Sequence, residues 1–253
     1  FDYDTKHNQS EFYRSQNFTE YQISVYPYEI HGRKYTFIGL NPFDFPSPHP
    51  PLLYNARQPN GLLDELEKTI KTVKKESEIV IFDHFPYFHW KFGPTASNGK
   101  NFKQILKDSN ITLFLNGHLH PSEPLYMHHD GFLEIVGCDL LEHQKFSVAV
   151  IDNRRLSYHT IDVKTVDKET VFGFVTNPIP DQLLSNHQIF NEKETFVRMI
   201  VYSKEEDEPL DLRATVSSGV LDNKNLSCNK TFVNESFRFW LCQTELKIEN
   251  EGT

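Results

Sequence analysis

The spacing of apolar and polar residues changes period along the first part of the chain. Residues 21–40 alternate with a period of two and are rich in aromatic and β-branched side chains. This pattern predicts two strands joined at His31-Gly32. Residues 62–73 instead carry leucine, isoleucine and valine at helical spacing. They predict an amphipathic helix after the proline-dense loop at 41–60.

Two short apolar runs follow, at residues 78–82 and 111–115. Each has the length and composition of a buried strand, and residues 101–109 between them predict a second short helix. Strand, helix and strand in this order favour a βαβ unit with at least partly parallel pairing. The aromatic segment 86–100 predicts a loop. We expect its rings to pack into the core, in preference to forming a lip over a site.

The pattern changes again in the second half of the chain. Strands are predicted at residues 132–140, 145–152 and 154–163, the last two flanking a tight hairpin. From Val171 onwards only strand-like segments occur. We therefore predict an α/β portion at residues 1–165, followed by an all-β module resembling an immunoglobulin-like sandwich at residues 166–253.

Charge and composition limit the classes of partner. The 253 residues carry a net charge of −9 and contain no basic block, which argues against nucleic-acid binding. No stretch approaches the ~18 uncharged apolar residues that span a bilayer. The abundance of aromatic residues argues against a disordered chain.

Glycosylation sequons indicate where the chain resides. There are six Asn-x-Ser/Thr triplets without a central proline, at Asn8, Asn17, Asn110, Asn225, Asn229 and Asn234. Sequons also arise by chance in Asn-rich sequences. Their number nevertheless favours the lumen of the secretory pathway or the extracellular face.

The three cysteines fit that location without proving it. Cys228 and Cys242 lie in a strand-patterned region at a spacing that allows a short cross-strand disulfide. Cys138 lies in an apolar segment, which predicts a buried free thiol. Three cysteines alone do not fix the redox compartment.

Candidate chemistry lies where the two apolar strands end. His118 and His120 follow the second strand, and extended residues two apart project to one side. His84 follows the first strand, and parallel neighbours bring their carboxyl ends to one edge of a sheet. Three imidazoles at one edge predict a site for Zn, Mn or Fe. Gly117 is expected to supply a backbone conformation closed to other residues.

A less specific interpretation has to be weighed against this one. Twelve histidines make a His-x-His triplet common by chance, and a histidine at a strand end is often a hydrogen-bonded structural residue. The other nine show no comparable setting and are interpreted as loop or surface residues: His7, His31, His49, His89, His128, His129, His143, His159 and His187.

The motifs Asp83-His84-Phe85-Pro86 and Gly117-His118-Leu119-His120 resemble the last two metal motifs of the calcineurin-like metallophosphoesterases. The order of segments is similar to the branch that contains transmembrane protein 62. The resembling segments, which cover most of the chain, are FYRSQNFTEYQ, HGRKYTFIGLNP, GLLDELEKTI, FDHFP, LNGHLH, GFLEIVGCD, KFSVAVID, VTNPIPDQLL and ETFVRMIVYS.

The resemblance implies that His84, His118 and His120 are ligands in a two-metal site that hydrolyses phosphate esters. In such a site paired Mn, Fe or Zn ions activate a bridging water. The family's Asp-x-His, Gly-Asp and Gly-Asn-His-Asp/Glu motifs do not occur in this sequence. We therefore expect a fragment of a longer phosphoesterase, inactive alone and at most a weak binder of one zinc ion.

The resemblance also implies a parent protein anchored in a membrane of the secretory pathway by segments outside this chain. The sequons agree with that orientation. Two further hypotheses stay open: a non-catalytic luminal or extracellular binding protein on a phosphoesterase-like fold, and a single-zinc hydrolase that uses only these three histidines. The class of phosphate ester is not defined by the sequence.

Overall fold

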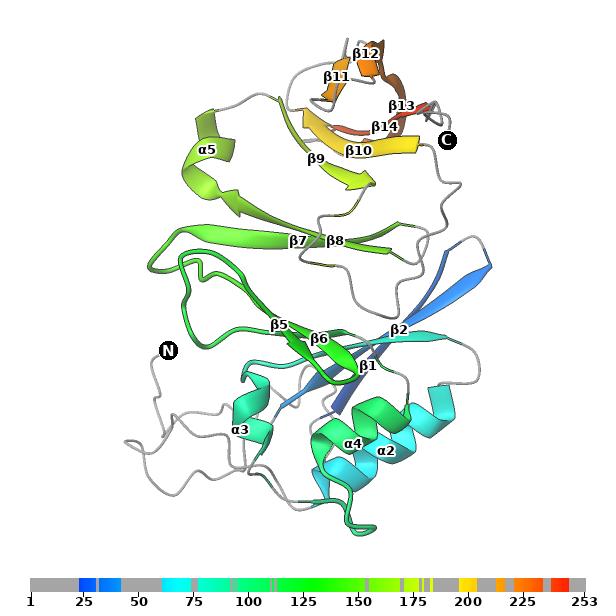
Figure 1. The fold of residues 1–253 in the computed structure, drawn as a ribbon, viewed down its shortest axis with the longest axis vertical. Helices are drawn as coiled ribbons and strands as arrows, with labels where there is room; N and C mark the ends of the chain where they lie inside the picture. Colours follow the sequence, from blue (N-terminus) through cyan, green and yellow to red (C-terminus); the bar gives the residue numbers. More distant parts are fainter. Residues whose placement is uncertain are drawn as a thin grey trace, which may run out of the picture. The chain divides into compact units, whose positions relative to one another are not determined.

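The computed structural model shows a mixed α/β fold in the first part of the chain and mainly strands in the second (Figure 1). Its contacts divide the chain into two compact units, Phe1–Cys138 and Asp139–Thr253. The residues that the structure describes are 23–30, 32–41, 61–73, 77–91, 93, 95–109, 111, 113–152, 155–168, 171–177, 179, 183, 196–203, 213–216, 221–233 and 238–245.

The first unit is built on a six-stranded mixed sheet in the order β1-β2-β3-β4-β6-β5. Its strands are β1 (Ile23–Ile30), β2 (Arg33–Leu40), β3 (Glu78–Phe82), β4 (Leu113–Asn116), β5 (Leu125–His129) and β6 (Phe132–Val136). The central strands β2, β3, β4 and β6 are parallel, and both edge strands run antiparallel to their neighbours. The predicted hairpin and parallel βαβ arrangement are confirmed.

Two helices pack against one face of this sheet and form the core with it (Figure 1). Helix α2 (Leu62–Val73) buries the leucine and isoleucine stripe that its sequence predicts. Helix α4 (Phe102–Asp108) is short and begins with a capping box. In this box the Asn101 side chain accepts a hydrogen bond from the Gln104 amide, and the Gln104 side chain accepts one from the Asn101 amide.

Two elements of this unit were not predicted. Helix α3 (Tyr87–Lys91) occupies part of the aromatic segment that was predicted as a loop. Trp90 is buried in the core cluster, as expected for core packing, whereas Phe88 is exposed. Strand β5 includes His128 and His129, which were interpreted as loop or surface residues.

The second unit consists largely of antiparallel strands. A four-stranded sheet runs in the order β13-β14-β10-β9, and β7-β8 and β11-β12 form two-stranded sheets. The strands are β7 (Lys145–Asp152), β8 (Arg155–Asp162), β9 (Val171–Asn177), β10 (Phe196–Ser203), β11 (Arg213–Val216), β12 (Leu221–Asn225), β13 (Ser227–Val233) and β14 (Arg238–Glu245). The strand-rich character was predicted, and the described strands do not by themselves define an immunoglobulin-like arrangement.

The division between the units differs from the predicted boundary at 165/166. Strands β7 and β8 both contact β9, so the contacts assign this hairpin to the second unit. The charged segment expected to be the boundary contains the short helix α5 (Val163–Lys168).

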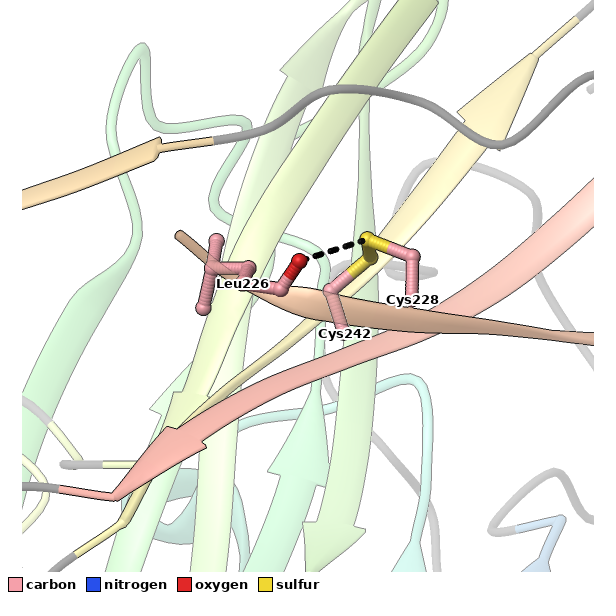
Figure 2. Close-up of a disulfide and its surroundings, with 3 residues drawn as sticks. All are labelled: Leu226, Cys228 and Cys242. Carbon is pink, nitrogen blue, oxygen red and sulfur yellow. Dashed lines mark hydrogen bonds between the residues drawn. A yellow bond between two sulfur atoms is a disulfide. The ribbon is translucent and has the colours of Figure 1, made fainter. Parts of the chain in front are cut away.

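A disulfide joins the last two strands of the second unit (Figure 2). Cys228 and Cys242 are direct partners in the antiparallel pairing of β13 with β14. Cys242 is fully buried in a small core with Val201 and Trp240. Cys138 is a free cysteine and is only half-buried, in contrast to the burial that its apolar neighbours predicted.

The structure bears on only part of the glycosylation prediction. Asn229 lies on β13 with an exposed side chain, as an acceptor for a glycan requires. Asn225 ends β12, and nothing is described for its side chain. Asn8, Asn17, Asn110 and Asn234 lie outside the described residues. None of the helices in the described ranges combines the length and apolar character needed to cross a bilayer.

Candidate histidine site

The pairing of β3 with β4 continues past the strand ends and brings two predicted ligands together. The Asp83 amide donates to the Leu115 carbonyl over 2.9 Å, and the Gly117 amide donates to the His84 carbonyl over 3.0 Å. These bonds fix the two loops that carry His84 and His118 at the carboxyl edge of the parallel strands. This is the edge at which open α/β sheets place their ligands.

One nitrogen atom of the His84 ring lies close to one nitrogen atom of the His118 ring. The distance between His84 Nε2 and His118 Nδ1 is 3.2 Å, and the ring centroids are 5.1 Å apart. Two nitrogen ligands of one tetrahedral zinc ion lie about 3.3 Å apart, given Zn–N bonds of about 2.05 Å. The contact is a hydrogen bond between the two rings, and its length is also close to the separation of two ligands of one ion.

His120 lies near this pair without completing it. Its charge lowers the pKa of both His84 and His118, so its ring is within electrostatic reach of them. Within the described part of the chain, these three histidines do not present three nitrogen atoms within 4.8 Å of one another. His120 is exposed, and a side-chain rotation would have to bring it to an ion held by the other two.

The backbone around His118 and His120 is unusual. Both residues have a positive φ, 73° and 47° respectively, in the left-handed region that residues with a Cβ atom rarely occupy. Gly117 does not have such an angle, and a Cβ atom placed on it would meet only the His84 carbonyl at an ordinary 3.8 Å. The expectation for Gly117 was therefore wrong, because the strained conformation belongs to the two histidines. Such strain is often found at functional sites.

Burial keeps the histidines neutral. The pKa of His84 is lowered from 6.5 to about 4, first by loss of solvent and then by the charges of His118, His120 and His89. The pKa of His118 is lowered by desolvation and by His120. Neutral imidazole is the form that donates a lone pair to a metal ion. Both shifts favour this neutral form of His84 and His118 at neutral pH.

A buried carboxyl group lies directly behind the site. Asp83 accepts hydrogen bonds from the His84 amide over 2.6 Å and from the Trp90 indole nitrogen over 2.8 Å. Loss of solvent nevertheless raises its pKa from 3.8 to about 8. At neutral pH Asp83 is therefore largely protonated, and it fixes the His84 backbone to helix α3.

His89 belongs to the same cluster, although it had been interpreted as a loop or surface residue. Its ring centroid lies 5.2 Å from that of His118 and 5.0 Å from that of Phe85. Its Nε2 atom is buried and has no hydrogen-bond partner among the described residues. The available signal was Pro86, since proline often opens a helix and the His89 amide bonds to the Pro86 carbonyl one turn earlier.

Comparison of the chain with models of protein families, with curated proteins and with solved structures gave no match.

Proposed function

We propose that this chain carries the histidine part of a divalent-metal site in a calcineurin-like metallophosphoesterase similar to transmembrane protein 62. In this proposal residues 1–165 correspond to the carboxyl-terminal part of the α/β catalytic domain and residues 166–253 to its β-sandwich module. The parent would be a hydrolase of phosphate esters, with this part on the luminal or extracellular side of a membrane. The observation that carries the proposal is the 3.2 Å separation of His84 Nε2 and His118 Nδ1.

The residues present fit an ion of the Zn, Mn or Fe type. His84 and His118 would be ligands through nitrogen atoms that are neutral at physiological pH. His120 would join them after a change of side-chain rotamer. In a complete site the ions would polarise a phosphoryl oxygen and lower the pKa of a bound water.

The chain's own residues prepare this chemistry without completing it. Asp83, held by Trp90, orients the backbone of His84, while the Gly117 amide bonds to the His84 carbonyl. No carboxylate of the Asp-x-His or Gly-Asp type occurs in the sequence. The chain alone should therefore bind one ion weakly and show no useful turnover. A non-catalytic binding protein on the same fold is the alternative, and the absence of these carboxylate motifs from the parent protein would favour it.

Removing one ligand should weaken metal binding by this chain. We expect His118→Ala to weaken Zn²⁺ or Co²⁺ binding at least 10-fold, because even residues that only support a ligand contribute 10–100-fold. Calorimetric titration of the purified chain measures the effect. His128→Ala is the matched control, since His128 is an exposed histidine of the same unit.

Turnover is tested in the parent protein. A longer form that includes the upstream motifs should hydrolyse a generic phosphodiester with Mn²⁺ or Zn²⁺, and His118→Ala should abolish this activity. If the upstream sequence lacks the Asp-x-His and Gly-Asn-His motifs, or if turnover does not depend on His118, the binding-protein interpretation replaces the enzyme.

A further inference from the structure

Glu134 is a buried carboxyl group on β6, the strand next to the edge strand β5 in the first unit's sheet. It lies in the middle of β6, whose five residues are all buried, and its own exposed fraction is 1%. It pairs with Phe114 of the parallel strand β4, and Phe114 belongs to the core beneath the helices. Burying a carboxylate is costly unless donors surround it, so its partners indicate why it is there.

Three donors from three different elements converge on Glu134. Oε1 accepts the Tyr87 amide at the start of α3 over 2.6 Å and the Asn116 side-chain amide over 2.8 Å. Oε2 lies 2.6 Å from Nε2 of His129 on β5. One carboxylate thus joins the start of α3, the end of β4 and the edge strand β5.

Two of these donors are directly connected to the candidate histidine site. Asn116 precedes the Gly117-His118 turn, and its own carbonyl accepts the Gly137 amide over 2.8 Å. Tyr87 follows His84 by three residues and precedes His89 by two. Both contacts end on Oε1, so a single oxygen atom binds the residues that flank the two histidine-bearing loops and links them to β6.

The third contact pairs Oε2 of Glu134 with a histidine ring on the edge strand β5. The ring of His129 lies 4.8 Å from the Tyr87 ring and 4.6 Å from the Phe132 ring, between centroids. The contacts described for His129 include the Tyr87 ring but neither His84 nor His118, so Oε2 reaches the two histidines only indirectly, whereas Oε1 binds the backbone amide of Tyr87 and the side chain of Asn116.

We propose that Glu134 is a positioning residue of the histidine site, which sets the separation of the His84 and His118 rings through Asn116 and the Tyr87 amide. The proposal deepens the metal site proposed above and rests on it for its functional meaning. Glu134 itself contacts no ion or substrate in this scheme. It acts through its hydrogen bonds to Tyr87 and Asn116, which fix the positions of the residues next to the two loops.

Three substitutions separate the roles of the two oxygen atoms. Glu134→Gln keeps an acceptor at Oε1 for both loop contacts, whereas Glu134→Met removes it at similar volume. His129→Leu removes only the partner of Oε2. If Glu134→Met fails to fold, Asn116→Ala takes its place, because it breaks one of the two loop contacts and leaves the carboxylate with its other donors.

The first measurement needs no metal. Nuclear Overhauser contacts between the His84 and His118 rings are recorded for the chain in the presence of a chelator. We expect the contact in the wild type, in Glu134→Gln and in His129→Leu, and its loss in Glu134→Met or Asn116→Ala. An unchanged ring contact in a folded Glu134→Met or Asn116→Ala variant overturns the proposal, as does its loss in Glu134→Gln.

The second measurement is a Co²⁺ titration followed by visible absorption, which reports the ligand geometry. Binding should weaken about 10- to 100-fold in Glu134→Met with a changed spectrum, and stay within about threefold in Glu134→Gln and His129→Leu. Equal weakening in all three variants contradicts a specific positioning role. If the wild type binds no Co²⁺ but the ring contacts follow the expected pattern, the metal site fails and the positioning role of Glu134 stands.

Discussion

Replacing Asp83 with asparagine should remove the pH dependence of stability that this residue causes. The pKa of Asp83 is about 8 in the folded chain, against 3.8 for an ordinary carboxyl group. Between these values the unfolded chain releases the proton first, so the free energy of unfolding falls as pH rises. Asparagine does not titrate, so the stability of Asp83→Asn relative to the wild type should increase from pH 5 to pH 9.

The expected size follows from about 1.4 kcal/mol per pKa unit. Water entering the site reduces the full value, and we expect the difference in unfolding free energy between variant and wild type to change by at least about 2 kcal/mol. At pH 5 the variant should be slightly less stable, by about 1 kcal/mol, because asparagine offers one acceptor to the His84 amide and Trp90 instead of two.

Urea unfolding at several pH values, in the presence of a chelator, measures this difference. Trp90 is the natural probe because it donates to Asp83, and Trp240→Phe in both proteins removes the other tryptophan signal. The lowered pKa of His84 has the opposite effect on the free energy of unfolding. This free energy falls as pH falls from 6.5 towards 4, because the unfolded chain takes up the proton first. That contribution is common to both proteins and cancels. A constant difference across this pH range would contradict the buried, protonated carboxyl group.

Asp130→Asn is the matched control for this experiment. Asp130 is an exposed carboxylate whose pKa is lowered by the hydrogen bond and charge of Lys107. Its titration is therefore complete well below pH 5, and the stability of Asp130→Asn relative to the wild type should not change between pH 5 and pH 9.

Removing the disulfide should destabilise the second unit by about 3 kcal/mol. The bond closes a loop with a sequence separation of 14 residues between Cys228 and Cys242. Cross-linking a loop of this length restricts the unfolded chain by about that amount. The double variant Cys228→Ala, Cys242→Ala should therefore unfold at lower urea concentration, and reductant should lower the midpoint of the wild type in the same way.

Trp240 reports on this unit because it lies in the same small core as Cys242. In a Trp90→Phe background its fluorescence follows only the second unit. Cys138→Ala is the control, since Cys138 is a free thiol and should leave the midpoint nearly unchanged. A midpoint that does not respond to reductant would show that the bond is not formed in solution.

Strands and helices with a clear period were predictable from the sequence, and those without one were not. Helix α2 and strands β1 to β4 follow the spacing of their apolar residues. Helix α3 has only five residues, rich in aromatic side chains, and its register depends on the bond between Trp90 and Asp83. Strand β5 has the sequence LYMHH, which shows no alternation of apolar and polar residues, and it pairs with β6. Tertiary contacts of this kind leave no periodic signal.

The same distinction applies to the candidate histidine site. The meeting of His84 and His118 was predictable, since both follow parallel neighbouring strands. His89 was missed because its position depends on α3, and Glu134 was missed because it lies within an apolar segment and lacks a motif. Residues that support a site from behind are recognised by their partners in space, which sequence spacing does not reveal.

The left-handed backbone at His118 and His120 has a consequence for how this chain tolerates change. Glycine at either position would relax the main chain, so a selection based on folding or expression yield alone would enrich for loss of these imidazoles. A selection for metal binding would instead retain the two histidines, at a cost in the free energy of folding. If one library of variants were put through both selections, the residues recovered would therefore differ most at positions 118 and 120.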